Sequence, residues 1–285
     1  MMIKITENKL RNKTKRNLII FTLVAMLCGW LGVALNNLID QPHEESLGML
    51  IFIGTPLLTV LVLRAFAGDG WKDAGFKPLF KGNVKWYIIS LFVFPVLTLT
   101  VVFIGYALGW ISLKGFDTVT YLQAFGLALI PNFIKNIPEE FVWRGYLTPK
   151  LLSVGVSDYK LYALVGVIWG AWHIPYYLYF LERDIVTEFT SLNITVFVSL
   201  SFIITIAWSI VFIEIWLLTK SIWPAVLMHM VEDAFVNPMV LDKAFQIMPG
   251  KDLIIHPVMG VLSIILYTVV GLGLRSIRIN SQSAQ

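Results

Sequence analysis

Apolar runs of 18 or more residues recur along the whole of this 285-residue chain. A run of that length is what an α-helix needs to cross the hydrocarbon core of a bilayer. Hydrophobic residues make up 57% of the chain and charged residues only 14%, whereas about 25% of a typical soluble domain is charged. The runs therefore predict an all-α integral membrane protein with about eight transmembrane helices and no separate soluble domain.

Turn residues and charges between the runs divide the chain into spans. The predicted spans are 18–38, 47–66, 86–110, 119–148, 160–181, 193–219, 222–241 and 253–274. Residues 1–17 are expected to form a basic cytoplasmic arm, 18–274 a single membrane domain, and 275–285 a cytoplasmic tail. The first run is longer than the apolar part of a signal peptide and no small-residue cleavage site follows it, so we expect a retained helix. Pro131 and Pro138 predict a kink or break in the fourth span.

Lysine and arginine are unevenly distributed between the predicted loops. With the N-terminus inside, the inner segments hold sixteen and the outer loops hold four. This bias predicts a multi-pass protein of the cell membrane with both termini cytoplasmic. The net charge of +4 follows from these loops, so it gives no reason to expect a nucleic-acid partner. The single cysteine, Cys28, lies within the first run and excludes an intrachain disulfide.

Three predicted spans carry ionisable side chains, which are costly at the membrane centre, about 2.5–3.5 kcal/mol each on insertion scales. Such side chains tend to face one another or a wet cavity, so they predict an intramembrane polar cavity. The set is Lys135, Glu139, Glu140 and Arg144 in the fourth span, His173 in the fifth, and His229, Glu232 and Asp233 in the seventh.

Helical spacing divides these residues further. Glu140 and Arg144 are four apart, so they share a helix face and can pair. Glu139 is rotated by about 100° from Glu140, which leaves it available for chemistry. His229 and Asp233 are also four apart. Carboxylates and histidines brought together in this way are suited to general acid–base catalysis.

Each of these features also has a purely structural interpretation. A Glu–Arg pair can simply lock helices together, and a lone intramembrane histidine can be an interhelical hydrogen-bond donor. We expect Glu214 to be structural, His43 to be solvated and His256 to have no catalytic role. The segment from residue 66 to 87 is basic and aromatic, and it is either an ordinary anchored loop or an amphipathic stretch on the inner membrane face.

Three motifs in this set resemble those of a known family. "EEFVWR" matches the EExxxR motif of the CAAX protease and bacteriocin-processing (Abi) family of intramembrane endopeptidases, "WGAWH" is similar to its second motif, and "HMVED" to its third. They occur in the family's order on neighbouring spans. The resemblance implies a helical membrane protease whose core spans about 119–241. It also implies a membrane-associated peptide or lipidated protein tail as substrate, or a role in bacteriocin immunity.

The resemblance also implies roles for the site residues. Glu139 is expected to be the general base that activates water, with His173 helping to bind or polarise it. Glu140 and Arg144 are expected to support the site, and His229 and Asp233 to steady the oxyanion or orient the water.

Two positions differ from the family pattern. Trp169 stands where the second motif usually has Phe, and Asp233 stands where the third usually has Asn. An ionised Asp233 cannot donate a hydrogen bond to an oxyanion, which would leave that role mainly to His229. A protonated Asp233 in a dry cavity could still donate.

Two questions stay open at this point. Glu139, His173 and His229 have the composition of a His₂Glu zinc site, but no HExxH motif is present, and water activation by Glu139 without metal is slightly favoured. The second question is whether the chain is a protease at all. One alternative is a catalytically silent interaction or immunity protein, and the other is a proton-coupled carrier, since buried acids and histidines also build proton relays.

Overall fold

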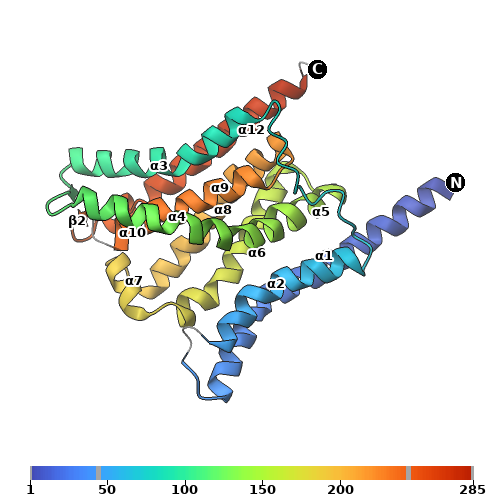
Figure 1. Cartoon of the computed structure of the whole chain (residues 1–285), viewed down its shortest axis with the longest axis horizontal. Coiled ribbons are helices and arrows are strands. Elements are labelled where there is room, and N and C mark those ends of the chain that lie inside the picture. The colour runs from blue at the N-terminus through green and yellow to red at the C-terminus, as the bar shows by residue number, and fades with distance from the viewer. Residues whose placement is uncertain (1, 43–45, 242–244, 284–285) are drawn as a thin grey trace.

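The computed structural model describes residues 2–42, 46–241 and 245–283, and these are mainly helical (Figure 1). The long helices are α1 (Met2–Leu38), α2 (Leu47–Ala65), α3 (Val84–Ala107), α4 (Thr118–Val142), α6 (Asp158–Pro175), α8 (Ile194–Thr219) and α12 (Val261–Ser283). The short helices are α5 (Thr148–Ser153), α7 (Arg183–Phe189), α9 (Trp223–Val231), α10 (Asn237–Leu241) and α11 (Asp252–Ile255). The described residues also contain three π-helical turns, η1 (Trp143–Leu147), η2 (Tyr176–Phe180) and η3 (Glu232–Val236). The strands β1 (Ile111–Ser112) and β2 (Gln246–Ile247) pair as a two-stranded antiparallel ladder.

Five helices of the described residues are long and apolar enough to cross a membrane. They are α1 from Leu10, α2, α3, α8 and α12. The prediction of an all-α integral membrane protein is confirmed. The other three predicted spans correspond to α4 with η1, α6 with η2, and α9 with η3 and α10, which carry the polar side chains and are interrupted by the π-turns.

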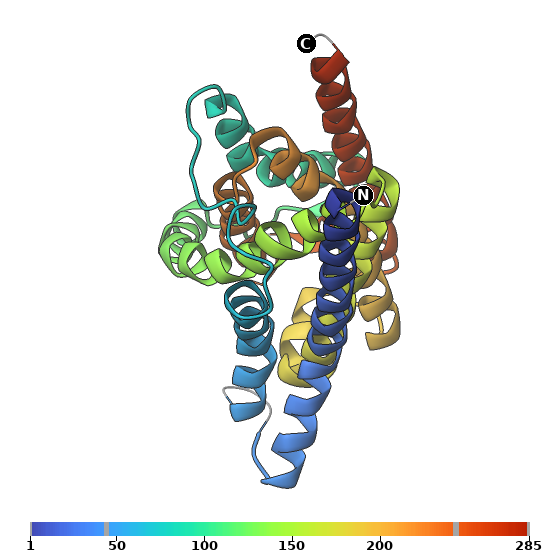
Figure 2. The same cartoon turned by 90° about the vertical axis from the view of Figure 1, so that its right-hand side faces the viewer.

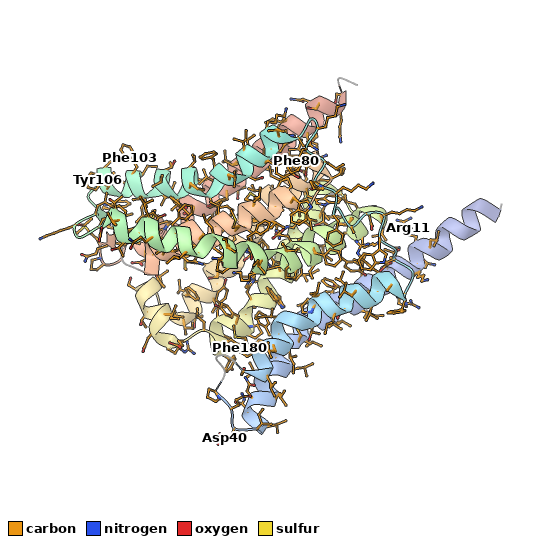
Figure 3. The ribbon with its side chains drawn as sticks, in the orientation of Figure 1. Arg11, Asp40, Phe80, Phe103, Tyr106 and Phe180 are labelled. Atoms are coloured by element: carbon orange, nitrogen blue, oxygen red, sulfur yellow. The ribbon has the colours of Figure 1, made fainter. Side chains whose placement is uncertain are left out.

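The helices form a bundle in which the polar segments lie between apolar ones. The helices α1 and α2 pack together as a pair on one side, and α3 and α12 lie on the opposite side (Figures 1 and 2). Between them, α6 packs on α8 and α4 packs on α9. Most of the long helices thus shield α4, α6 and α9, and large apolar side chains fill the space between them (Figure 3).

Glycines allow the closest helix contacts. A Cβ on Gly32 of α1 would overlap the carbonyl oxygen of Gly48 of α2, and a Cβ on Gly166 of α6 would lie 2.6 Å from the Cα of Ile206 in α8. Backbones can approach this closely only where a side chain is absent. Gly166 therefore sets the distance between α8 and the helix that carries His173.

Two boundaries differ from prediction. The helix α1 begins at Met2 rather than near residue 18, because the arm has no glycine or proline and its lysines, arginines and leucine are good helix formers. The last helix begins at Val261 and continues through the predicted tail to Ser283, while residues 252–255 form the separate helix α11. Pro257 and Gly260 lie between the two and break the predicted span.

The prolines of the fourth span have a different effect from the one predicted. The helix α4 runs through Pro131 and Pro138 without interruption, and the change in geometry comes later, where η1 begins. There the N–H of Thr148 bonds to the carbonyl of Trp143, and the Thr148 hydroxyl donates to the same oxygen at 2.8 Å. Pro149 has no N–H for the carbonyl of Gly145, which accepts from Arg64 of α2 instead.

Candidate active site

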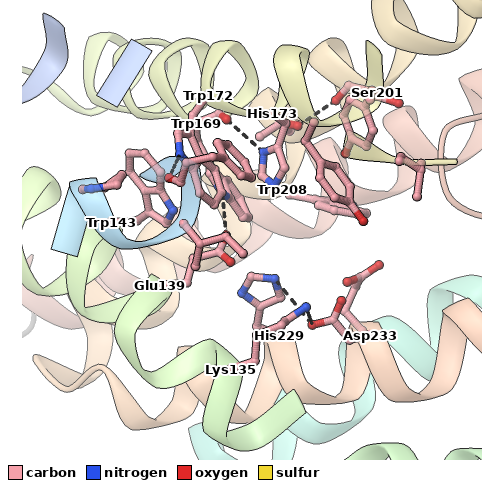
Figure 4. Close-up of a pocket in the computed structure, with 18 of the residues that line it drawn as sticks. Lys135, Glu139, Trp143, Trp169, Trp172, His173, Ser201, Trp208, His229 and Asp233 are labelled. Carbon is pink, nitrogen blue, oxygen red and sulfur yellow. Dashed lines mark hydrogen bonds and ion pairs between the residues drawn. The ribbon is translucent and has the colours of Figure 1, made fainter. Parts of the chain in front are cut away.

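A pocket of about 410 Å³ lies between α2, α4, α6, α8 and η3. Its ionisable acids, lysine and histidines come from α4, α6, α9 and η3, and include Glu139, His173 and His229 (Figure 4). The rest of its lining is mainly aromatic and aliphatic. Most of the residues that suggested a cavity thus line one pocket, whereas Glu140 and Arg144 lie behind it.

Glu140 binds two cationic side chains at once. Its Oε1 accepts from the Arg144 guanidinium at 2.9 Å and from Nδ1 of His229 at 2.8 Å. The side chains of Glu140 and Arg144 are fully buried, so the pair predicted from their spacing is present and has no contact with solvent. The bond to His229 links α4 to α9 and fixes the orientation of the imidazole ring.

Arg144 is held by rings as well as by charge. Its guanidinium carbon lies 4.2 Å from the ring centroid of Trp169 and 4.1 Å from that of Phe212. These cation–π contacts offset part of the cost of burying a guanidinium. Arg144 is thereby enclosed behind the pocket and does not line it.

Glu139 lies in the pocket, apart from the Glu140 pair. Its Oε1 accepts a hydrogen bond from the indole N–H of Trp169 at 2.9 Å (Figure 4). This donor exists because tryptophan occupies the position, since a phenylalanine ring has none. One carboxylate oxygen is therefore anchored, and the carboxylate as a whole remains part of the pocket wall.

His173 is oriented by its own helix. Its Nδ1 lies 2.9 Å from the carbonyl oxygen of Trp169, and its ring stacks on Tyr177 at a centroid distance of 5.7 Å. A carbonyl is only an acceptor, so Nδ1 carries the proton and Nε2 of the neutral ring has a free lone pair. His229 also directs its Nδ1 at an acceptor, the Glu140 carboxylate, so Nδ1 of this ring carries a proton as well.

Asp233 is surrounded by donors. Its Oδ2 lies 2.8 Å from the ammonium of Lys135 and accepts from the Asn136 amide at 2.7 Å, while its Oδ1 accepts from Asn237 at 3.4 Å. His229 Nε2 is 3.9 Å from the same Oδ2, which is beyond hydrogen-bond distance. Asp233 is therefore an acceptor in this arrangement, and Nε2 of His229 lies beside it without a hydrogen bond to it.

Sequence reasoning missed Asn136 and did not assign Lys135 to the site. Asn136 precedes Glu140 by four residues and is fully buried, so its polar side chain on the Glu140 face was an available signal. Lys135 was recognised as an intramembrane charge, but helical spacing alone does not predict a partner on another segment.

The positions of the possible ligand atoms bear on whether the site could hold a metal ion. In the described part of the chain, the group whose ligand atoms all lie within 4.8 Å of one another is His229, Glu232 and Asp233. In that group, Asp233 already binds Lys135. The predicted set of Glu139, His173 and His229 is chemically suitable, because each histidine binds a carbonyl or carboxylate through Nδ1, as metal-ligating histidines usually do. Zinc there stays a prediction.

The remaining predicted residues lie outside the pocket. Glu214 is fully buried and accepts from Arg278 and from the Tyr162 hydroxyl, which is consistent with a structural role. His256 is buried, and its Nδ1 accepts from the backbone N–H of Val258 at 3.2 Å. His43 falls outside the described residues.

The fold and the pocket together define a class: a multi-pass helical membrane protein with acids and histidines around a pocket between its helices. Residues 119–235 match the family model described as type II CAAX prenyl endopeptidase Rce1-like. This match confirms the family resemblance predicted from the three motifs, and it covers α4, α6 and α9, which carry them. It indicates a protease, and thus a hydrolase. No curated protein shows a significant match to the chain.

Proposed function

We propose that this protein is an intramembrane endopeptidase that hydrolyses a peptide bond of a membrane-associated or lipidated peptide, using water activated by Glu139. The observation that carries the proposal is the position of Glu139, a pocket carboxylate with one oxygen fixed by Trp169 and histidines on the neighbouring helices. The family match to a CAAX-type endopeptidase supports the same reaction.

Glu139 acts as the general base in this scheme. The carboxylate oxygen not bound to Trp169 takes a proton from water as the water attacks the scissile carbonyl. His173 accepts the second hydrogen of the same water through its unprotonated Nε2 and so fixes its direction. Both groups are pre-oriented by Trp169, one through its side chain and the other through its backbone carbonyl.

His229 stabilises the tetrahedral intermediate. Its ring lies between the carboxylates of Glu140 and Asp233, which favour the imidazolium form, and Nε2–H is then a donor directed at the oxyanion. Glu140 orients this ring and Arg144 balances the charge of Glu140. Lys135 and Asn136 hold Asp233 as an acceptor. The amine product leaves after taking the proton from Glu139.

Glu139, His173 and His229 are the residues that would hold a zinc ion. When bound, zinc would polarise the carbonyl and lower the pKa of a bound water. The roles of Glu140 and Trp169 as orienting groups are the same with or without metal.

The substrate is a CAAX-type tail or another processed peptide, and the protease core is residues 119–241. The mainly aromatic and aliphatic lining of the pocket suits a lipid-bearing or strongly apolar segment. The lysine and arginine distribution supports cytoplasmic termini in the cell membrane. Bacteriocin immunity would be a consequence of the same cleavage.

The test uses the purified protein in detergent and a panel of membrane-associated peptides with and without a lipidated tail. Wild type, Glu139→Gln and the surface control Glu182→Gln are each assayed with and without a strong zinc chelator. We expect Glu139→Gln alone to lose cleavage. Loss in wild type on chelation identifies the metal-dependent form, and equal cleavage by wild type and Glu139→Gln refutes the proposed base.

A further inference from the structure

A second cavity, of about 910 Å³, lies outside the candidate active site. Its walls come from residues 71–79 of the loop after α2, from α5, and from the end of α8. Figure 1 shows this loop at the end of the molecule where both termini lie, and Figure 3 places Phe80 and Arg11 at that end. The cavity is therefore at the strongly basic end of the chain.

The loop that forms the cavity is fixed to the helices. The buried guanidinium of Arg64 binds Asp73 at 2.8 Å, and Lys150 of α5 binds the other oxygen of Asp73 at 2.8 Å. The carbonyl of Gly75 accepts from the N–H of Ile222 at 3.0 Å. The carbonyl of Phe76 accepts from the indole N–H of Trp223 at 2.7 Å. These bonds to α2, α5 and the start of α9 hold the loop in place, so the cavity is a fixed part of the fold.

The charge within the cavity is strongly positive. Lys72, Lys77 and Lys220 line it and are exposed, and none of them has an ion-pair partner among the residues that the structure describes. Asp73 is the acid in the lining, and Arg64 and Lys150 already neutralise it. Three ammonium groups are thus available to one ligand.

Lys220 occupies a position that usually belongs to another residue. It caps α8 in the left-handed conformation, with φ of 55°, where glycine or asparagine is preferred. A non-glycine residue there carries backbone strain. The lysine lies over the Trp216 ring at 4.8 Å, and the buried indole N–H of Trp216 has no acceptor in the described part of the chain. A strained cation and an unused donor therefore lie in the same cavity wall.

We propose that this cavity binds the phosphate head group of an anionic membrane lipid. The candidate membrane span of α8 ends at Thr219, directly before Lys220, so the cavity is at head-group depth. Its rim carries the exposed apolar side chains of Trp71 and Phe76, which suit the interface between head groups and acyl chains. Lysines near a membrane surface attract anionic lipids. The proposal does not depend on peptidase activity.

The test measures binding of a short-chain phosphatidylglycerol to the full chain in detergent. Wild type is compared with Lys72→Gln/Lys77→Gln/Lys220→Gln and with a control of equal charge, Lys81→Gln/Lys85→Gln/Lys160→Gln, whose side chains are exposed and do not line the cavity. We expect a weakening on the order of 100-fold in the cavity variant, from roughly fivefold per lysine. The control is expected to bind within about threefold of wild type.

Three further arms decide what is bound. Short-chain phosphatidylcholine and inorganic phosphate are each expected to bind at least tenfold more weakly than phosphatidylglycerol. Lys220→Gly removes one cation and the backbone strain together, so we expect it to bind the lipid more weakly while melting no lower than wild type. Equal weakening in the control variant would show a general charge effect and overturn the site. Equal affinity for inorganic phosphate would show that the cavity binds free phosphate, and would overturn the assignment to a lipid head group.

Discussion

Glu139 and Glu140 are adjacent, but the structure predicts different effects when each is neutralised. Neutralising Glu139 should lower activity and leave stability nearly unchanged, whereas neutralising Glu140 should lower stability. Glu139→Gln keeps a side-chain oxygen that can accept from Trp169, so the one hydrogen bond of this carboxylate survives. We expect the free energy of unfolding to change by less than about 1 kcal/mol. Activity is expected to fall by about 10²–10⁴, the usual contribution of a general base.

Glu140→Gln removes the charge that compensates a fully buried guanidinium. Arg144 and His229 both bind the lost carboxylate oxygen, at 2.9 and 2.8 Å, and the fully buried Arg144 has no solvent to replace it. Breaking a buried pair by removing one partner costs about 3–5 kcal/mol. At about 2–4 °C per kcal/mol for a chain of this size, the melting temperature is expected to fall by roughly 6–20 °C.

The assay is thermal unfolding of both variants and wild type in the same detergent, followed by fluorescence, with peptide cleavage measured on the same preparations. The expected pattern is a stable, inactive Glu139→Gln and a destabilised Glu140→Gln. If Glu139→Gln melts as low as Glu140→Gln, the two carboxylates share one structural role. If Glu140→Gln melts like wild type, the buried pair does not have the energy assigned to it.

Four further predictions test other parts of the structure. Trp169→Phe removes the donor to Glu139 but keeps an aromatic ring, so kcat/KM should fall by about three- to thirtyfold; an unchanged value would show that Glu139 needs no anchor. Asp233→Asn keeps an oxygen that can accept from Asn136 and loses the charge that faces the half-exposed Lys135 and, at 3.9 Å, Nε2 of His229, so cleavage should stay within about tenfold and stability within about 1 kcal/mol. In the loop after α2, burial raises the pKa of Asp73, but hydrogen bonds from Lys150 and Arg64 outweigh it and hold the pKa below its usual value. The resulting stability is present above the unfolded pKa near 3.9 and is lost as pH falls through the folded pKa, so Asp73→Asn should flatten the fall in melting temperature between about pH 5 and 3. Gly166→Val should lower the melting temperature because its side chain overlaps Ile206, whereas Gly126→Ala, which meets nothing within 4 Å, should not.

The sequence was sufficient for the features that depend on local periodicity. Apolar run length predicted the membrane helices, and the spacing of Glu140 and Arg144 predicted a pair that the structure contains. The motif residues of three spans meet in one place because charged groups within a membrane need partners or water, which is a general constraint.

Contacts between side chains on different helices could not be predicted from the sequence. Nothing in local spacing shows that His229 binds Glu140 or that Lys135 and Asn136 share Asp233, since these bonds depend on how α4 packs on α9 and η3. Whether tryptophan in place of phenylalanine matters was also undecidable, because the indole N–H acts only through Glu139 on another helix.

The three π-turns have a consequence for anyone who alters or transplants this site. Each occurs on a motif helix, with Arg144 inside η1, Asp233 inside η3, and η2 beginning three residues after His173. A π-turn holds one residue more than an α-helical turn, so deleting one residue there would restore regular geometry and rotate one half of the helix by about 100° against the other. Copying the three motifs onto ideal α-helices would keep their amino-acid sequence but point their side chains in the wrong directions. Insertions and deletions in these turns are therefore a sharper probe of the site than most point substitutions.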